Sequence, residues 1–342
     1  MPPPTTPSLP KVLPPTAPLK TLPSSTLFPD DQRSLSRRSE STDSTDTSTE
    51  STASDTATDD LNEDKAILVL ATSELVPLLD VADDLTRMQD AILSTDWLVQ
   101  YTAIETFRRG IVHHTRMAST CVAAMLDPLT AASLNLRSAM SKNALLALAE
   151  SFEFASDDVM LAPDATTRAV CDALLKRAAC EKKFLRDAAD LSLTKLATCV
   201  PSPTAAVACA AVADSKSNKL CAAGCNATMQ CLSEMQRRGM TIASDTEMAS
   251  GLAHQLIKFR SGKDIKTRDD ALKGLVHASH IIGGIDILEA LVTKHVSNKG
   301  AAIKLIADIK TARNGRPVSK GTRPRGGSGL RDMLRDRKSL VE

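Results

Sequence analysis

The chain has 342 residues, a nearly balanced formal charge of +1, and only 2% aromatic residues. β-Sandwiches and β-barrels favour aromatic and β-branched side chains, so this composition argues against both. A chain rich in Ala and Leu instead suits helices that pack on helices, because Ala lets two backbones approach closely.

The sequence predicts neither a membrane span nor a secretory signal. No run of about 18 apolar residues is present, so we expect no helix that crosses a membrane. The first residues lack a charged start followed by an apolar stretch, so we expect no signal peptide. The eight cysteines are therefore expected in a reducing compartment, as small buried core residues.

The first 64 residues are predicted to form a disordered arm. Residues 1–29 are dense in proline, and residues 30–60 consist mostly of Ser, Thr, Asp and Glu. Such segments cannot bury enough apolar surface to fold. Within the arm, Arg33, Arg37 and Arg38 lie among serines. This run fits either a phosphorylation-tuned docking segment or a solvated tail.

A helical pattern begins at about Lys65. Residues Ile67 to Leu79 are strongly apolar, and an amphipathic helix follows and ends before the turn Ser94–Asp96. One of these turn residues can cap a second helix, which starts at Trp97, the only tryptophan in the chain. These two helices form one antiparallel pair.

The helix pair then recurs along the chain. Pro128 is expected to interrupt the first helix of the second pair, because proline removes a hydrogen-bond donor. The turns within the later pairs are predicted at Leu134–Ser138, Cys180–Phe184, Asp214–Lys219 and Arg260–Arg268. Two more helices are predicted over Asp286–Thr293 and Lys299–Thr311.

Small residues recur at equivalent places in the second helices, about every 38 to 45 residues, which is the period of HEAT and armadillo repeats. They are Ala103, Ala144, Ala189, Ala227 and Ala271. A helix pair cannot bury its apolar face alone, so stacked pairs share one core. The sequence predicts an all-α fold, an α-solenoid of HEAT-like antiparallel helix pairs over residues 65–312. Residues 313–342 are expected to form a basic disordered tail with a short amphipathic helix at Leu330–Val341.

The turns inside successive pairs should lie along one edge of the solenoid. Trp97 stands at the first turn, and positively charged residues follow in the later turns. The main ones are Arg137, Lys182, Lys183, Lys219 and Lys266. Two interpretations are open. The charges are either those of ordinary solvated loops, or they form a basic ridge that docks on an acidic protein with Trp97 as its anchor.

Three segments resemble the repeats of a TOG domain, the tubulin-binding HEAT-repeat module of microtubule regulators. They are DWLVQYTAIETFRRGIVHH from residue 96, NLRSAMSKNALLALAESF from residue 135 and FLRDAADLSLTKLA from residue 184. They look closest to the CLASP-like and crescerin (TOGARAM) branch and to plant TOG-like armadillo proteins. The resemblance covers roughly residues 75–280.

The resemblance implies that the turn edge binds αβ-tubulin. It places Trp97 on β-tubulin and the later basic turns toward α-tubulin. Carried over to this sequence, the tubulin-binding residues are Trp97, Arg137, Lys182, Lys183, Lys219 and Lys266. The second turn departs from the pattern, because no clear apolar anchor stands out there.

No motif predicts catalysis, a cofactor or a metal site. The glycine pairs lack the context of a phosphate-binding loop, and His277 and His280 lack further ligands for zinc. A nucleic-acid partner is not expected, because few aromatics are available for base stacking. The sequence thus predicts a non-catalytic microtubule- or tubulin-binding protein of the cytoplasm and cytoskeleton, with a cilium or spindle as possible sites. The alternative is a generic HEAT/armadillo adaptor that binds a peptide or protein on its concave face.

Overall fold

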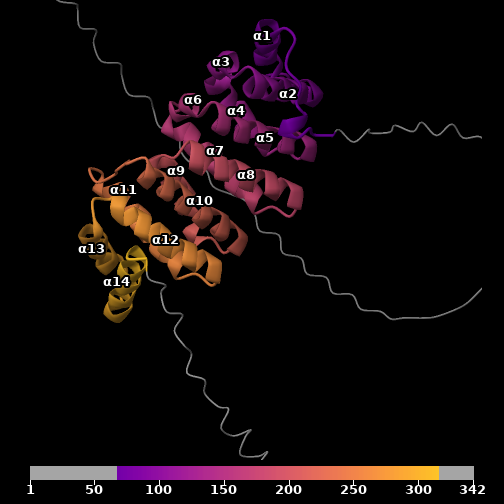
Figure 1. Ribbon diagram of the computed structural model, residues 1–342. Helices are drawn as coiled ribbons and strands as arrows, with labels where there is room; N and C mark the ends of the chain where they lie inside the picture. The colour runs from indigo at the N-terminus through magenta and orange to yellow at the C-terminus, as the bar shows by residue number, and fades with distance from the viewer. Residues whose placement is uncertain (1–67, 316–342) are drawn as a thin grey trace, which may run out of the picture. The chain divides into compact units, whose positions relative to one another are not determined.

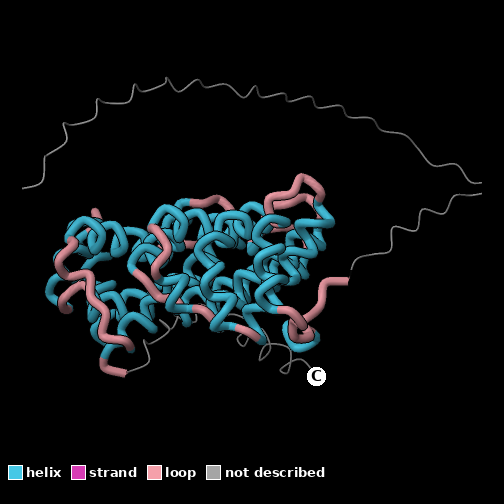
Figure 2. The backbone as a smooth tube through the Cα atoms, turned by 90° about the horizontal axis from the view of Figure 1, so that it is seen from above, coloured by secondary structure: helices cyan, strands magenta, loops and turns pink. Residues whose placement is uncertain are grey.

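The computed structural model describes residues 68–315, which all belong to one compact unit of the chain. Within this range the chain is built from α-helices and short 3₁₀ turns, with no β-strand (Figures 1 and 2). The predicted arm over residues 1–64 and the predicted helix Leu330–Val341 lie outside the described residues.

Six antiparallel helix pairs follow one another in residues 81–313. Their first helices are α1 (Val81–Ala91), α4 (Val122–Ser133), α7 (Asp164–Ala178), α9 (Pro203–Ala210), α11 (Thr246–Arg260) and α13 (Ile285–His295). Their second helices are α2 (Trp97–His113), α5 (Ser138–Phe154), α8 (Lys183–Cys199), α10 (Asn218–Arg237), α12 (Ile265–Ile281) and α14 (Lys299–Arg313). Short helices α3 (Thr115–Ala118) and α6 (Ser156–Met160) and the 3₁₀ turns η1 (Thr72–Glu74), η2 (Ser119–Cys121) and η3 (Ala211–Asp214) complete the described chain.

The pairs stack so that second helices contact second helices throughout, and first helices contact first helices from α4 onward. Figure 1 shows α5, α8, α10 and α12 side by side in this second layer. The small residues that marked the period, Ala103, Ala144, Ala189, Ala227 and Ala271, are all at most 3% exposed. One continuous apolar core runs between the two layers. The predicted all-α solenoid of HEAT-like helix pairs is confirmed.

The prediction that Pro128 interrupts a helix was wrong. Helix α4 runs through this residue without a break. Proline leaves the carbonyl of Ala124 without its helical donor, but Ala124 is exposed, so water can reach that carbonyl. Leu126 and Leu129 on the other side of the helix are at most 2% exposed, and their burial offsets the local cost.

The apolar stretch before α1 is not helical, apart from the single turn η1. We call residues 68–79 the N-terminal strap. It buries Val69, Leu75 and Leu78, while Pro77 limits helix formation. Side chains of α2 donate to the carbonyls of Leu70, Leu75, Val76 and Pro77, so these four groups need no helical hydrogen bonds. The helical pattern predicted from Lys65 therefore begins only at Val81.

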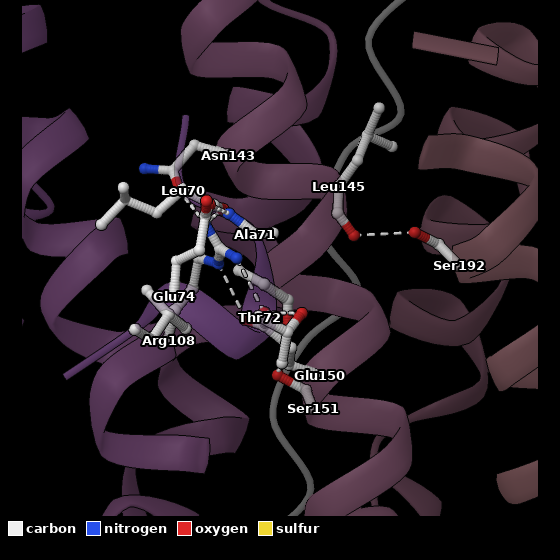
Figure 3. Close-up of polar contacts among 12 residues, drawn as sticks. Leu70, Ala71, Thr72, Glu74, Arg108, Asn143, Leu145, Glu150, Ser151 and Ser192 are labelled. Atoms are coloured by element: carbon white, nitrogen blue, oxygen red, sulfur yellow. Dashed lines mark hydrogen bonds and ion pairs between the residues drawn. The ribbon is translucent and has the colours of Figure 1, made fainter. Parts of the chain in front are cut away.

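A buried ion pair joins the first two helix pairs (Figure 3). Arg108 on α2 is fully buried and donates to both carboxylate oxygens of Glu150 on α5, at 2.8 Å each. Its Nη1 also donates to Asn143 Oδ1 and to the carbonyl of Leu70 in the strap, both at 3.0 Å. The Thr72 hydroxyl donates to Glu150 at 2.7 Å. Each charge is thus paired and hydrogen-bonded, as burial requires.

Candidate protein-binding edge

The turns that join the first and second helices of each pair, with the opening residues of the second helices, define what we call the turn edge. Side-chain contacts link the first four turns in order. The Arg137 guanidinium lies 4.5 Å from the centre of the Trp97 ring. Lys182 Nζ donates to Ser138 Oγ at 2.6 Å, and Lys219 Nζ lies 3.5 Å from Glu181. These contacts bring the first four turns together along one edge, as the sequence predicted.

Trp97 is the first residue of α2, and Asp96 caps this helix by accepting from the amide of Leu98 at 2.8 Å. The indole ring is half-buried and packs against the core, while the Arg137 guanidinium covers one of its faces. Such a cation–π contact contributes about 0.5–1 kcal/mol at an exposed site. Trp97 therefore supports the first turn as well as forming part of its surface.

The sequence missed the apolar side chains that project from the later turns. Leu136 in the second turn is 96% exposed, which corrects the expectation that this turn has no anchor. Phe184 near the start of α8 is 45% exposed, and Ile265, the first residue of α12, is 66% exposed. Each lies directly beside a basic residue of the ridge. The signal was present as an apolar residue among polar ones in each predicted turn.

Two of the predicted binding residues stand at helix starts where a capping residue is expected. Arg137 occupies the N-cap position of α5, and Lys182 occupies that of α8, and neither side chain makes a capping hydrogen bond. By contrast, Ser217 caps α10 and Asp264 caps α12. A positive charge at a helix N-terminus also opposes the helix dipole. The basic residue at each of these two positions thus costs helix stability.

The remaining predicted residues are exposed on the same edge. Lys183 lies in the first turn of α8 and is paired with Asp187 at 2.7 Å. Lys219 and Lys266 lie in the first turns of α10 and α12. These surface pairs are weak, so the lysines can exchange partners readily. The sequence placed all six residues correctly on this edge, while their binding role stays a prediction.

A hollow of about 280 Å³ opens between the fourth and fifth turns. Lys216, Lys258 and Lys263 line it, with Phe259 at its base. Lys258 is paired with Asp214 at 2.6 Å. Asp264 also lines the hollow, so its charge is mixed.

Two arginines near the turns hold the fold together. Arg177 donates to the carbonyls of Ser133 and Asn135 at 2.7 and 2.8 Å, which ties the second turn to α7. Arg186 donates to the carbonyls of Cys180 and Glu181 within the third turn. These two guanidinium groups are therefore engaged within the fold.

The described residues hold no grouping of three or more His, Cys, Asp or Glu side chains suited to a metal. His277 faces Gln236 at 2.7 Å, and burial lowers the pKa of this imidazole. Burial raises the pKa of the Cys225 and Cys231 thiols to about 12, so both stay protonated and unreactive. Cys180, Cys199 and Cys221 are partly exposed, unlike the buried cysteines the sequence led us to expect. No described helix combines the length and apolarity needed to cross a membrane.

Known structures resemble this chain in fold. A chain from the work on microtubule plus-end tracking by XMAP215, CLIP-170 and EB1 matches 70% of this chain and 95% of its own length, at 13% identity and a TM-score of 0.50. The fold is an α-solenoid. A chain from the work on TOG–tubulin binding specificity covers 70% and 90%, at 13% identity and a TM-score of 0.45.

A designed armadillo repeat protein in complex with the peptide (KR)4 covers 67% of this chain and 99% of its own, at 14% identity and a TM-score of 0.35. No family model matches the sequence, and no curated protein matches it either. At these identities the likenesses concern the fold, so function is argued from the turn edge itself.

Proposed function

We propose that the protein binds tubulin or microtubules through its turn edge, without catalysis, and so regulates microtubule organisation or stability. The observation that carries the proposal is the alternation of exposed apolar and basic residues along this edge, above all Leu136 beside Arg137. Apolar anchors supply affinity, and the surrounding charges select an acidic partner and speed its approach.

Two further observations favour this proposal. Arg137 and Lys182 are basic residues at N-cap positions, where a capping side chain would stabilise the helix. Such a loss of stability is typical of functional positions. The fold also matches a chain from a study of microtubule plus-end tracking. The finer proposals, a CLASP-like or crescerin-like branch and work in a cilium or spindle, rest on the sequence resemblance alone.

The alternative is an adaptor that holds a peptide on the concave face of its helices. In the first two pairs, residues 68–74 of the chain itself already contact α2 and α5. Leu136 and Ile265, two strongly exposed apolar residues, lie instead in a turn or directly after one. The turn edge is therefore the better candidate for a protein partner.

The test is co-sedimentation of the full chain with taxol-stabilised microtubules, beside gel filtration with free tubulin. We expect Leu136→Ala to weaken binding about tenfold, because it removes a central apolar anchor. Lys182→Glu should weaken it as well. The matched controls are Leu161→Ala and Arg116→Glu, since both residues are exposed in connections between pairs, on the opposite edge.

Binding to polymer alone would indicate a lattice stabiliser, and a shift of free tubulin would indicate a protein that handles dimers. Binding to neither form would contradict the proposal. Equal losses in the edge variants and their controls would show that the turn edge is not the binding surface.

A further inference from the structure

The N-terminal strap is held in a manner that resembles a bound peptide. The α2 side chains bind its backbone carbonyls. Arg109 donates to the carbonyls of Val76 and Pro77 at 2.8 and 3.0 Å. His113 Nε2 donates to the carbonyl of Leu75 at 2.7 Å, and Arg108 donates to that of Leu70.

Recognition through carbonyls depends little on which side chains the bound segment carries. The strap's own side chains add a few specific contacts. Val69, Leu75 and Leu78 are 8%, 4% and 6% exposed, and the Thr72 hydroxyl donates to Glu150. By contrast, Leu68, Val76 and Leu79 point to solvent at 78%, 59% and 100% exposure.

Part of the polar network under the strap lies within α2 and α5 themselves. Glu150 and Asn143 on α5 fix the Arg108 guanidinium through three hydrogen bonds. Asn143 is itself held, because its amide donates to the carbonyl of Tyr101 at 3.1 Å. These four contacts join α2 and α5 alone, while Leu70 and Thr72 of the strap add hydrogen bonds to the same Arg108–Glu150 pair (Figure 3). Donors fixed in advance bind a ligand with a smaller loss of entropy.

We propose that α2 and α5 form a binding groove for an extended peptide, and that the strap fills this groove as a built-in competitor. The ligand is an extended segment of another protein. It presents its carbonyls to Arg108, Arg109 and His113 and a hydroxyl side chain to Glu150. It also presents three apolar residues at the places of Val69, Leu75 and Leu78. This inference is independent of the proposed role of the turn edge.

Release of the strap would open the groove while the solenoid stays folded. The strap joins α1 at a solvent-exposed position. Leu79, its last residue, is fully exposed, and the next residue, Asp80, is the N-cap of α1. On release, Glu150 keeps both of its bonds to Arg108, so no buried charge loses its partner. A partner peptide can therefore displace the strap by competing for the same groove.

The experiment uses the full chain with a protease site inserted between Leu79 and Asp80. After cleavage, the released N-terminal fragment is removed. A fluorophore-labelled peptide with the sequence LVLATSELVPLL, that of residues 68–79, is then added and its anisotropy is followed. We expect saturable binding to the cut protein and at least about tenfold weaker binding to the uncut protein. Circular dichroism should show that the cut protein keeps its helices.

Matched variants identify the groove. Arg109→Leu should weaken peptide binding about tenfold, because it removes two charge-assisted carbonyl bonds. Arg87→Leu is the control, since this exposed arginine of α1 pairs only with Asp84 and the carbonyl of Asp83. A peptide with Val in place of Thr72 should also bind more weakly. In an uncut chain, Leu75→Glu should release the strap and allow the labelled peptide to bind.

The proposal is overturned if the cut chain unfolds, because the groove would then depend on the strap. Equal binding by cut and uncut protein would overturn it too, since the peptide would then bind elsewhere. An equal effect of Arg109→Leu and Arg87→Leu would have the same consequence.

Discussion

Arg108 is the largest fully buried side chain in the described part of the chain, and its charge has a single carboxylate partner. Removing one member of such a pair leaves the other charge buried and unpaired. Replacing both by apolar side chains avoids that penalty. The pair therefore specifies how α2, α5 and the strap meet, more than it adds net stability.

We expect Arg108→Met and Glu150→Leu each to lower the free energy of unfolding by about 3–5 kcal/mol. The double variant should lose clearly less than the two losses together. Urea unfolding of the four proteins measures this coupling. Additive losses would show that the two side chains stabilise the fold independently.

Glu234 on α10 makes the stability depend on pH. Hydrogen bonds from Arg237, and then from Arg238, lower the pKa of this carboxyl group from 4.5 to about 2, although partial burial acts against them. Arg238 in turn donates to the carbonyls of Thr198 and Cys199 at the end of α8. Protonation of Glu234 thus loosens the contact between the third and fourth helix pairs.

A group whose pKa is lowered by folding stabilises the folded state when the pH is above its ordinary value. Its contribution is present above pH 4.5 and is lost as the pH falls toward about 2. Glu234→Gln should therefore lower the free energy of unfolding at pH 7 and matter progressively less in acid. Glu247→Gln, at an exposed position of α11, is the control. An unfolding difference for Glu234→Gln that is constant with pH would contradict this linkage.

At the scale of elements, the second helices differ in how they begin. Asp96, Ser217, Asp264 and Asn298 cap their helices by accepting backbone amides, whereas α5 and α8 start with a base. Helices in one solenoid layer thus pack in the same way but differ in how their N-termini are capped. The departure at α5 coincides with the most exposed of the three anchors, Leu136, whereas Ile265 lies at the capped start of α12.

We expect Lys182→Asp to raise the free energy of unfolding by about 1 kcal/mol, because the new carboxylate can accept the free amides of α8. The same change should weaken binding to microtubules. Lys216→Asp is the matched control for stability, since Lys216 precedes the Ser217 cap and provides no new cap. Denaturant titration and co-sedimentation measure the two effects. A variant that gained stability and kept full binding would separate Lys182 from the interface.

At the scale of the whole molecule, the two kinds of contact should respond differently to salt. Exposed charges are screened within about 8 Å at physiological ionic strength, whereas the apolar core and the buried ion pair are not. Raising the salt from about 0.05 M to about 0.5 M should weaken partner binding steeply and change the unfolding free energy little. Co-sedimentation and urea titration in the same buffers test this. Binding that is insensitive to salt would exclude the basic ridge as its source.

The sequence predicted the solenoid well, because the recurrence of Ala103, Ala144 and their equivalents reports a core that every helix pair must share. It also placed the six candidate binding residues in the correct turns. It failed where tertiary contacts decide. The run of apolar residues in the strap suggested a helix. Its extended backbone is explained only by the hydrogen-bond donors on α2, which the sequence does not reveal. Leu136 was missed because composition alone does not say which apolar residue is left outside the core.

The uncapped starts of α5 and α8 have a consequence for how such a chain changes over generations. Mutation pressure combined with selection for folding alone would replace Arg137 and Lys182 by Asp, Ser or Asn, since each replacement improves the helix start. Lineages that lose the partner should drift in that direction first. A laboratory selection for heat resistance should do the same, and it would yield a sturdier scaffold that no longer performs its task.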